Sequence, residues 1–352
     1  MNEQLRVLIV RLGAMGDILH AMPAVTSLRE RHPHWFLGWA VEPRWQALLR
    51  GSGSAMPLVN RVHLVKAKEW ARAPFSSKTI EEIRSVRRDL QAERYDVCID
   101  LQGAVRSAVL GRMAGAPRMI GEESPREPAA RWLFRERRAT QGVHVIEQAV
   151  EVCEAIAEEK LRPALPLLPV DPAAEEWADS LLNGGQRGAA KGLVLMNPGA
   201  GWGAKRWPAE RYGAVGRKLC AAGYRVMINA GPEEQAIAAE AAEIMGGAGR
   251  VQELVPEFTL DRLISILRRA SLMIAGDTGP LHLACALGKP VVGIFGPTEP
   301  KRNGPFGVPF RVLRHPESKR DHTRRAHPEA GLLTITADEV YLAAIELLEK
   351  QA

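Results

Sequence analysis

The first group that could do chemistry is a carboxylate, Asp17, shortly after the first apolar segment of the chain. Residues 6–10 have the composition of a buried strand and lead into residues 11–20, RLGAMGDILH. The two glycines of this turn let the backbone approach a ligand closely. The turn lacks the third glycine of a dinucleotide fingerprint and the Gly-Lys-Ser/Thr of a P-loop. Asp17 could act as a general base towards a substrate hydroxyl, or simply complement the positive end of the next helix.

A second candidate segment, residues 197–208 (NPGAGWGAKRWP), follows the apolar run at 193–197. Its three glycines and its Lys205-Arg206 pair suit an anion such as a diphosphate, which backbone N–H groups and the Lys205 ammonium would bind. A mobile surface loop is the alternative. The flanking tryptophans argue against that alternative, because loops rarely expose two of them.

A third segment, residues 274–284 (IAGDTGPLHLA), has the pattern of a strand followed by a helix with Pro280 in its first turn. A helix N-terminus carries unpaired N–H groups and partial positive charge, which suits a phosphate. Thr278 and Gly279 would present those groups, and Asp277 could hold sugar hydroxyls. Asp277 or Thr278 as a simple helix cap is the alternative, and it does not exclude the site.

Two further segments carry weaker signals. Glu233 or Glu234, at the start of a predicted helix, could accept hydrogen bonds from a ribose diol, although an acidic first helical turn is the ordinary alternative. Lys66, Lys68 and Arg72 form a basic stretch with neighbouring aromatic residues. That stretch is either a solvated loop or a contact with an anionic acceptor or lipid surface. No Asp-x-Asp motif is placed to hold a metal–diphosphate, so no metal is expected.

The elements that must position these groups alternate between short apolar runs and helices. Strands are predicted at 6–10, 37–41, 62–65, 96–101, 193–197, 225–230, 272–276 and 291–296. Helices are predicted at 79–93, 209–222, 233–245, 260–269, 280–287 and 337–349. Apolar runs alternating with helices predict parallel sheets covered on both faces, and two such series predict two doubly wound α/β domains.

The length of 352 residues suits two domains of about 150 residues each. Prolines and glycines between the two series predict a linker at 166–190, which separates an N-terminal domain at 1–165 from a C-terminal domain at 191–336. An amphipathic helix at 337–350 follows a basic loop. Because ligands of open parallel sheets bind outside the carboxyl ends of the strands, the ligand is expected in the cleft between the domains.

The composition is that of a soluble globular protein, with 25% charged residues and no apolar run near the roughly 20 residues of a membrane span. No signal peptide is recognisable, and the four cysteines form no Cys-x-x-Cys pair, so reduced cysteines in a cytosolic protein are expected. Residues 1–165 hold 25 lysines and arginines against 20 acidic residues, and the remainder holds 22 against 21. A basic first half could meet nucleic acid, anionic lipid or a phosphorylated substrate.

Together, and in this order, the segments resemble glycosyltransferase family 9, the ADP-heptose:lipopolysaccharide heptosyltransferases. Residues 13–20 are similar to the family's N-terminal motif, and residues 277–284 followed by 295–298 (FGPT) are similar to its C-terminal signature. Softer matches to the heptosyltransferase I branch, which adds the first heptose to Kdo on lipid A, lie at 70–76, 100–108 and 126–128. The resemblance implies a GT-B fold, with two Rossmann-like doubly wound domains facing a central cleft and the last helix joining the N-terminal domain.

The resemblance also implies roles for single residues. Asp17 matches the catalytic base, Lys205 the phosphate-binding lysine, Asp277 the carboxylate that holds the heptose, and Phe258 a position lining the adenine pocket. The donor-binding set is Ala200, Gly201, Lys205, Glu233, Glu234, Phe258, Asp277, Thr278, Gly279 and His282, in which either Glu233 or Glu234 meets the ribose. The acceptor-binding set is Gly13, Met15, Gly16, Lys66, Lys68, Arg72, Gln102 and Arg126. Ala200 and Gly201 stand where some members have hydroxyl residues, which leaves backbone donors for the diphosphate.

The activity so implied is inverting, metal-independent transfer of L-glycero-D-manno-heptose from ADP-heptose to Kdo of lipid A–Kdo. No cofactor and no nucleic acid take part, and the protein is expected in the cytoplasm, peripherally on the inner membrane. Three alternatives remain open: another family 9 transferase that adds the second heptose or a different sugar, a nucleotide-sugar epimerase of similar fold, and a non-catalytic nucleotide-sugar binding protein.

Overall fold

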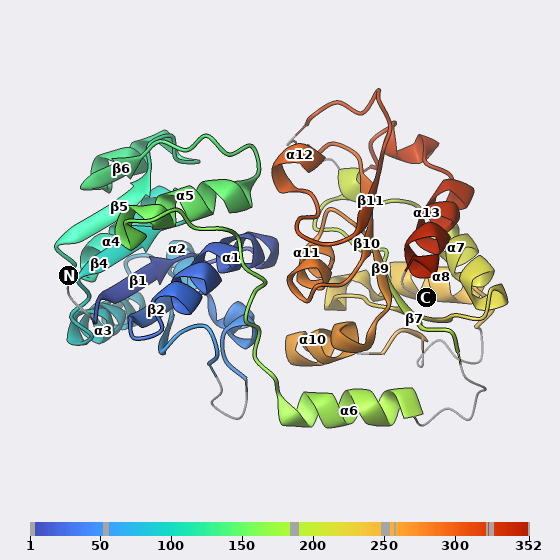
Figure 1. Cartoon of the computed structure of the whole chain (residues 1–352), viewed down its shortest axis with the longest axis horizontal. Helices are drawn as coiled ribbons and strands as arrows, with labels where there is room; N and C mark the ends of the chain where they lie inside the picture. The colour runs from blue at the N-terminus through green and yellow to red at the C-terminus, as the bar shows by residue number, and fades with distance from the viewer. Residues whose placement is uncertain are drawn as a thin grey trace. The chain divides into compact units, whose positions relative to one another are not determined.

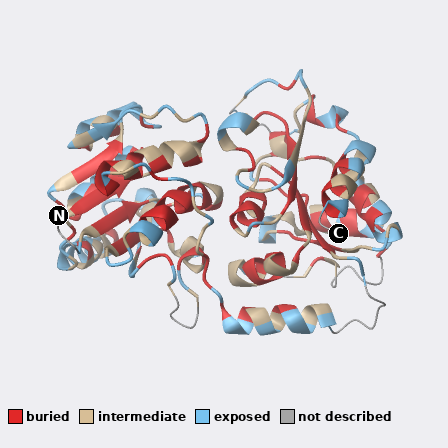
Figure 2. Cartoon of the chain, in the orientation of Figure 1, coloured by how far each residue is buried: buried red, intermediate tan, exposed pale blue. Residues whose placement is uncertain are grey.

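The chain forms two compact units, Met1–Val170 and Asp171–Ala352, in the computed structural model (Figure 1). The structure describes residues 4–51, 56–183, 190–247, 254–256, 258–321, 323 and 327–350. Each unit is built around one β-sheet in which every pairing between described strands is parallel. The central strands of both sheets are almost entirely buried (Figure 2).

The first unit contains a six-stranded sheet in the order β3-β2-β1-β4-β5-β6. Its strands are β1 (Arg6–Val10), β2 (Phe36–Val41), β3 (Arg61–Leu64), β4 (Val97–Asp100), β5 (Arg118–Glu122) and β6 (Glu136–Arg138). Its helices are α1 (Met15–Arg31), α2 (Ala67–Arg72), α3 (Ser77–Ala92), α4 (Val105–Met113) and α5 (Val145–Ala157), with 3-10 turns η1 (Pro43–Leu48) and η2 (Pro128–Leu133). This is the Rossmann strand order, whose direction reverses between β1 and β4.

The second unit contains a five-stranded sheet in the order β11-β10-β9-β7-β8. Its strands are β7 (Leu193–Asn197), β8 (Arg225–Ile228), β9 (Leu272–Gly276), β10 (Val291–Phe295) and β11 (Phe310–Arg314). Its helices are α6 (Pro172–Asn183), α7 (Ala209–Ala221), α8 (Gln235–Ile244), α10 (Leu260–Arg269), α11 (Gly279–Ala286), α12 (Pro300–Asn303) and α13 (Ala337–Glu349), with 3-10 turns η3 (Gly203–Lys205), η4 (Pro232–Glu234) and η5 (Leu332–Thr334). The strand order is that of flavodoxin-like sheets, and its direction reverses between β7 and β9.

The predicted doubly wound α/β class is confirmed in both units, and all eight predicted strands form within two residues of their expected bounds. Three strands were not predicted, namely β5, β6 and β11. β6 and β11 are edge strands with exposed or half-buried arginines, and β5 is a buried strand with charged ends and an internal glycine. None of the three has the continuous apolar run by which buried parallel strands are recognised.

The segment expected as a linker at 166–190 instead contains α6, which belongs to the second unit and packs against α10. Arg269 of α10 donates hydrogen bonds to the carboxylates of Glu175 and Asp179 of α6, the latter at 2.7 Å. The division between the units therefore lies at Val170–Asp171, and residues 184–189 lie outside the described part of the chain.

The last helix, α13, has the predicted bounds but does not join the first unit as expected. Its apolar face packs in the core of the second unit with α7, β9, β10 and β11. Val340, Ala344 and Leu347 of this face are at most 2% exposed. The physical reason is that α7 and the sheet of the second unit offer an apolar surface, which the apolar face of α13 covers.

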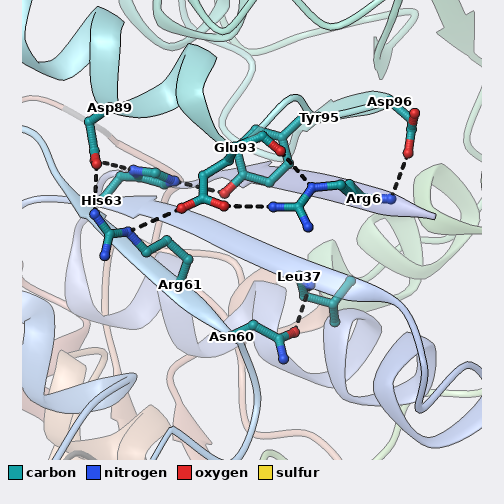
Figure 3. A network of polar contacts seen from close by, with 9 residues as sticks. All are labelled: Arg6, Leu37, Asn60, Arg61, His63, Asp89, Glu93, Tyr95 and Asp96. Carbon is teal, nitrogen blue, oxygen red and sulfur yellow. Dashed lines mark hydrogen bonds and ion pairs between the residues drawn. The ribbon is translucent and has the colours of Figure 1, made fainter. Parts of the chain in front are cut away.

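A polar network ties α3 and the segment after it to β1 and β3 in the first unit (Figure 3). The buried His63 ring lies between Asp89 Oδ2, at 2.5 Å from Nδ1, and the Tyr95 hydroxyl, at 2.7 Å from Nε2. Arg6 at the start of β1 donates to the Glu93 carboxylate at 2.6 Å. Arg6 lies at the amino end of β1, whereas His63 pairs with Ala40 near the carboxyl end of β2, so the network spans the length of the strands.

Candidate active site

Asp17 is the third residue of α1, which continues through Pro23 to Arg31. Its Oδ2 accepts a hydrogen bond from the Ala14 backbone N–H at 3.0 Å, so Asp17 does interact with the N-terminus of α1 as the alternative interpretation proposed. Its Oδ1 lies 3.0 Å from Nη2 of Arg11. The Asp17 side chain remains 37% exposed, whereas that of Arg11 is 15% exposed. The carboxylate is therefore oriented from two sides and still accessible to a substrate hydroxyl.

Arg11 also joins the loop after β1 to the loop after β4. Its Nη1 donates to the backbone carbonyl of Leu101, and its own carbonyl accepts from the Trp39 indole N–H at 3.1 Å. The buried side chain of Gln102 accepts from the Leu12 backbone N–H at 2.8 Å. β1 and β4 are neighbours at the point where strand order reverses, so these bonds hold the turn that contains Asp17 at the topological switch point.

The loop after β4 is organised by Asp100, which is 2% exposed. Its Oδ1 accepts from the backbone N–H groups of Gln102 and Gly103 at 2.7 and 2.8 Å. Burial raises the pKa of the Asp100 carboxyl to about 6, although the hydrogen bond from Gly103 opposes that rise. Gly103 has φ +64°, and a Cβ there would lie 3.0 Å from the backbone nitrogen of Arg126. A glycine is therefore required where the loops after β4 and β5 meet.

The other acceptor-binding candidates fall into two groups. Gly13, Met15 and Gly16 lie in the Asp17 turn, and a Cβ on Gly13 would lie 2.9 Å from the Trp45 indole nitrogen. Arg126 is exposed on the loop after β5. The structure thus brings Gly13, Met15, Gly16 and Gln102 together with Asp17, with Arg126 on the adjoining loop.

The basic stretch of α2 is arranged less simply than its sequence predicts. Lys66 Nζ donates to the Glu82 carboxylate at 3.1 Å, which also accepts from the Trp70 indole N–H at 2.9 Å. Lys68 is half exposed and lies 4.0 Å from the buried Glu42 carboxylate. Arg72 is exposed. Lys66 therefore anchors α2 to α3, and Lys68 and Arg72 remain the more accessible cations.

In the second unit, Lys205, Asp277 and His282 form a compact charged cluster. Lys205 Nζ lies 2.5 Å from Asp277 Oδ2 and 3.3 Å from the Asp277 carbonyl, and His282 Nε2 lies 3.1 Å from Asp277 Oδ1. The side chains of Lys205 and Asp277 are 14% and 9% exposed. Burial by itself would raise the pKa of the Asp277 carboxyl, but the His282 hydrogen bond and the Lys205 charge outweigh it and hold that pKa well below its usual range.

This cluster also lies at a topological switch point. Lys205 ends η3 in the loop after β7, and Asp277 directly follows β9, the strand beside β7. A Cβ on Gly276 would lie 3.3 Å from the Lys205 carbonyl, so the glycine permits the close approach of the two loops. The Lys205 ammonium lies 5.0 Å from the centre of the Trp202 ring. A protonated amine fixed at this edge can bind a phosphate oxygen.

The N-terminus of α11 adjoins the cluster. α11 begins at Gly279 with Pro280 in its first turn, and among the described residues no side chain caps it. The Thr278 hydroxyl donates instead to the Gly276 carbonyl at 3.3 Å. The first-turn N–H groups of α11 could bind an anion, and the anion site stays a prediction of the sequence.

Glu233 and Glu234 point to different surroundings. The Glu234 carboxylate accepts from the Gly231 N–H at 3.2 Å and lies against Gly199, where a Cβ would be only 2.0 Å from its Cδ. Glu233 is exposed. Glu234 therefore contacts the glycine loop after β7, which also contains the buried Ala200 and the exposed Gly201.

Phe258 lies beside Trp177 of α6, the helix that occupies part of the segment expected as a linker. Its ring makes an edge-on contact with Trp177 at 5.7 Å between ring centres, and the Arg262 guanidinium lies 4.8 Å from the Trp177 ring. An aromatic pair of this kind is suited to an adenine face.

Sequence reasoning missed Arg11, Asp100 and Trp177 as contributors to these sites. Arg11 directly precedes the glycine turn, which was a usable signal. Asp100 was noted only as part of a motif, and its role depends on burial that no spacing reveals. In the part of the chain that the structure describes, no group of three His, Cys, Asp or Glu side chains is placed to hold a metal ion.

Comparison with solved structures agrees with this two-sheet architecture. The E. coli heptosyltransferase WaaC with ADP matches with a TM-score of 0.76 and 27% identity, covering 99% of this chain and 100% of that one. E. coli ADP-heptose lipopolysaccharide heptosyltransferase II matches with a TM-score of 0.77 over 99% of both chains, and at 20% identity this likeness shows the fold alone. The fold is therefore the GT-B fold of glycosyltransferases, as expected.

The sequence comparisons are more specific. Residues 83–332 match the model of glycosyltransferase family 9 (heptosyltransferase). Lipopolysaccharide heptosyltransferase 1 of Escherichia coli K12 is 31% identical over 323 residues, covering 89% of this chain and 94% of the relative. The protein of the same name from Pseudomonas aeruginosa PAO1 is 28% identical over 312 residues, covering 86% and 82%. The chain belongs to glycosyltransferase family 9.

Membership confirms the family predicted from the motifs, and the protein is a heptosyltransferase of lipopolysaccharide core biosynthesis. The family match includes the Lys205–Asp277–His282 cluster and begins after the Asp17 turn. None of the helices among the described residues is both long enough and apolar enough to cross a bilayer.

Proposed function

We propose that this protein transfers L-glycero-D-manno-heptose from ADP-heptose to a Kdo residue of lipid A–Kdo, with inversion and without a metal ion. Two observations together carry the proposal. In the first unit, the accessible Asp17 carboxylate forms an ion pair with Arg11 at the switch point of the sheet. In the second unit, Lys205, Asp277 and His282 form a charged cluster at the switch point of that sheet. The first supplies a base for an acceptor hydroxyl, and the second supplies cationic and N–H donors for a diphosphate.

The donor is proposed to bind the second unit. A solved structure of WaaC, which is 27% identical to this chain, contains ADP-2-deoxy-2-fluoro heptose, and another contains ADP. In this chain the α11 N-terminus and Lys205 would hold the diphosphate, and Asp277 would accept hydrogen bonds from heptose hydroxyls. Glu234, beside the glycine loop, is the better placed of the two glutamates for the ribose, and Phe258 with Trp177 would face the adenine.

The chemical step follows from these assignments. Asp17 accepts the proton of a Kdo hydroxyl as that oxygen attacks the anomeric carbon from the face opposite ADP, so the new C–O bond forms while the bond to the ADP oxygen breaks. The negative charge that develops on the departing diphosphate is stabilised by the Lys205 ammonium and the α11 N–H groups. Donors of this kind are each worth about 3 kcal/mol in a transition state.

The acceptor is proposed to bind the first unit. Lys68, Arg72 and Arg126 are accessible cations there, as phosphates of a lipid A–Kdo acceptor require. The lipid anchor of such an acceptor would bring the protein peripherally to the cytoplasmic face of the inner membrane. Relatives named heptosyltransferase 1 match at 28–31% identity, whereas E. coli heptosyltransferase 2 matches at 25%, which favours addition of the first heptose.

The test is ADP release by the purified full-length protein from ADP-heptose, with and without Kdo-lipid A and in the presence of EDTA. Release that needs the acceptor and resists EDTA is expected, with the anomeric configuration of the product read by NMR. Asp17→Asn, which removes the charge and preserves the size, is the matched control. Release without acceptor would indicate a different reaction, and EDTA-sensitive release would overturn metal independence. ADP binding without release with Kdo-lipid A would overturn the acceptor assignment.

A further inference from the structure

We propose that one outer surface of the first unit, formed by α4 and η2, docks on an anionic phospholipid surface. The α4–η2 face consists of Val105, Arg106, Val109 and Arg112 of α4 and Arg131 and Trp132 of η2. The inference rests on the proposed transfer to a lipid-anchored acceptor, because that reaction requires the enzyme at a membrane.

The apolar part of this face is exposed although the elements that bear it are well packed. Val105, Val109 and Trp132 are 37%, 45% and 78% exposed. Beneath them, Ala108 of α4 and Ala130 of η2 are fully buried in the core cluster that covers β1. Val105, Val109 and Arg112 are spaced by four and three residues, so they lie on one side of α4. The exposure is therefore a property of a fixed surface and not of a loosely packed segment.

The charge of this face favours an anionic partner. Neither α4 (VRSAVLGRM) nor η2 (PAARWL) contains an acidic residue, and together they carry three arginines. The Arg131 guanidinium lies 5.5 Å from the centre of the Trp132 ring. The nearby Glu127 carboxylate is engaged by the Val105 N–H at 2.8 Å. An exposed tryptophan and valines among arginines match an interfacial surface on anionic lipid.

The position of this face connects it to the candidate acceptor site. α4 starts at Val105, directly after the loop in which Gln102 binds the Leu12 N–H of the Asp17 turn. The Glu127 N–H, just before η2, donates to the Gly103 carbonyl of the same loop at 2.8 Å. Docking through α4 and η2 would thus place the Asp17 end of the sheet next to the lipid surface, where the sugar of a lipid-anchored acceptor projects.

Co-sedimentation with vesicles tests the surface directly. The full-length protein is expected to bind vesicles of phosphatidylcholine mixed with phosphatidylglycerol more tightly than vesicles of phosphatidylcholine alone. Trp132→Ala should weaken binding to the mixed vesicles about tenfold. The triple replacement of Arg106, Arg112 and Arg131 by Gln should weaken it about 100-fold, or about fivefold for each charge. Leu342→Ala on α13 and Arg217→Gln on α7, which are exposed residues of the second unit, are the matched controls and should bind as wild type does.

Activity on two forms of the acceptor separates this inference from the proposed function. Trp132→Ala should keep the wild-type kcat/KM towards a water-soluble, deacylated Kdo acceptor and lose about tenfold towards the same acceptor embedded in mixed vesicles. Equal vesicle binding by wild type and both variants overturns the docking surface. The docking surface is also overturned if the wild-type protein forms a dimer that Trp132→Ala disrupts while vesicle binding is unchanged. In that case the α4–η2 face binds a second copy of the chain and not a lipid surface. If wild type uses neither acceptor, the proposed function fails, and vesicle binding still decides the surface.

Discussion

Replacing Lys205 by Met should show how much the second unit depends on the buried charge pair with Asp277. The Lys205 Nζ–Asp277 Oδ2 distance is 2.5 Å, and the two side chains are only 14% and 9% exposed. Lys205→Met keeps most of the side-chain volume and leaves the carboxylate with His282 as its remaining partner. Removing one member of a buried ion pair costs about 3 kcal/mol, which in a unit of this size lowers the melting temperature by roughly 6–12 °C.

The same replacement should weaken ADP binding. A hydrogen bond to a charged group is worth about 1.5–3 kcal/mol, so the dissociation constant of ADP should rise roughly 10- to 150-fold. Calorimetric titration measures that affinity, and differential scanning calorimetry measures the melting temperature. Lys218→Met is the matched control, because Lys218 pairs with Asp338 at the surface, where the side chains are 44% and 71% exposed. Its loss should cost less than about 1 kcal/mol and leave ADP binding unchanged.

The pH dependence of the effect has a definite sign. The pKa of the folded Asp277 carboxyl lies below its ordinary value, so its stabilising contribution is present at neutral pH and is lost as the pH falls below about 4. The stability difference between wild type and Lys205→Met should therefore shrink at low pH. If Lys205→Met melts at the temperature of Lys218→Met, the cluster does not have the structural role assigned to it. If Lys205→Met binds ADP as tightly as wild type, Lys205 does not have the binding role assigned to it.

Three further predictions concern the first unit. Asp17→Asn should lower kcat by a factor of about 10²–10⁴ while ADP affinity is unchanged, measured by ADP release and calorimetry; full turnover would refute the base assignment. Gln102→Leu leaves the Leu12 N–H without its acceptor, so kcat/KM for the acceptor should fall roughly tenfold with no change in ADP affinity; an equal loss of ADP affinity would instead mean general damage. Asp100 has a raised pKa of about 6, so wild-type stability should fall as the pH rises from about 4 to 6; Asp100→Asn should gain about 3 kcal/mol relative to wild type over that range in denaturant titrations, and parallel pH profiles would contradict the shift.

The sequence by itself determined the elements and the turns that carry function. Apolar runs such as β1, β7 and β9 could be placed within a residue or two because a strand covered on both faces must be apolar along its whole length. The turns after β1, β7 and β9 were recognisable because each places glycines and an Asp or Lys directly after an apolar strand, where open parallel sheets bind their ligands. Asp17, Lys205 and Asp277 could therefore be proposed as site residues from the sequence alone.

Only the tertiary structure decided which groups meet. Lys205 and Asp277 are 72 residues apart in the chain, and Arg11 reaches Leu101 across 90, because strand order brings the loops after neighbouring strands together. Strand order depends on how helices cover the two faces of each sheet, which local spacing does not encode. For the same reason, the sequence predicted that α13 exists and is amphipathic but not which sheet it covers. That choice depends on which complementary apolar surface lies within reach of the helix.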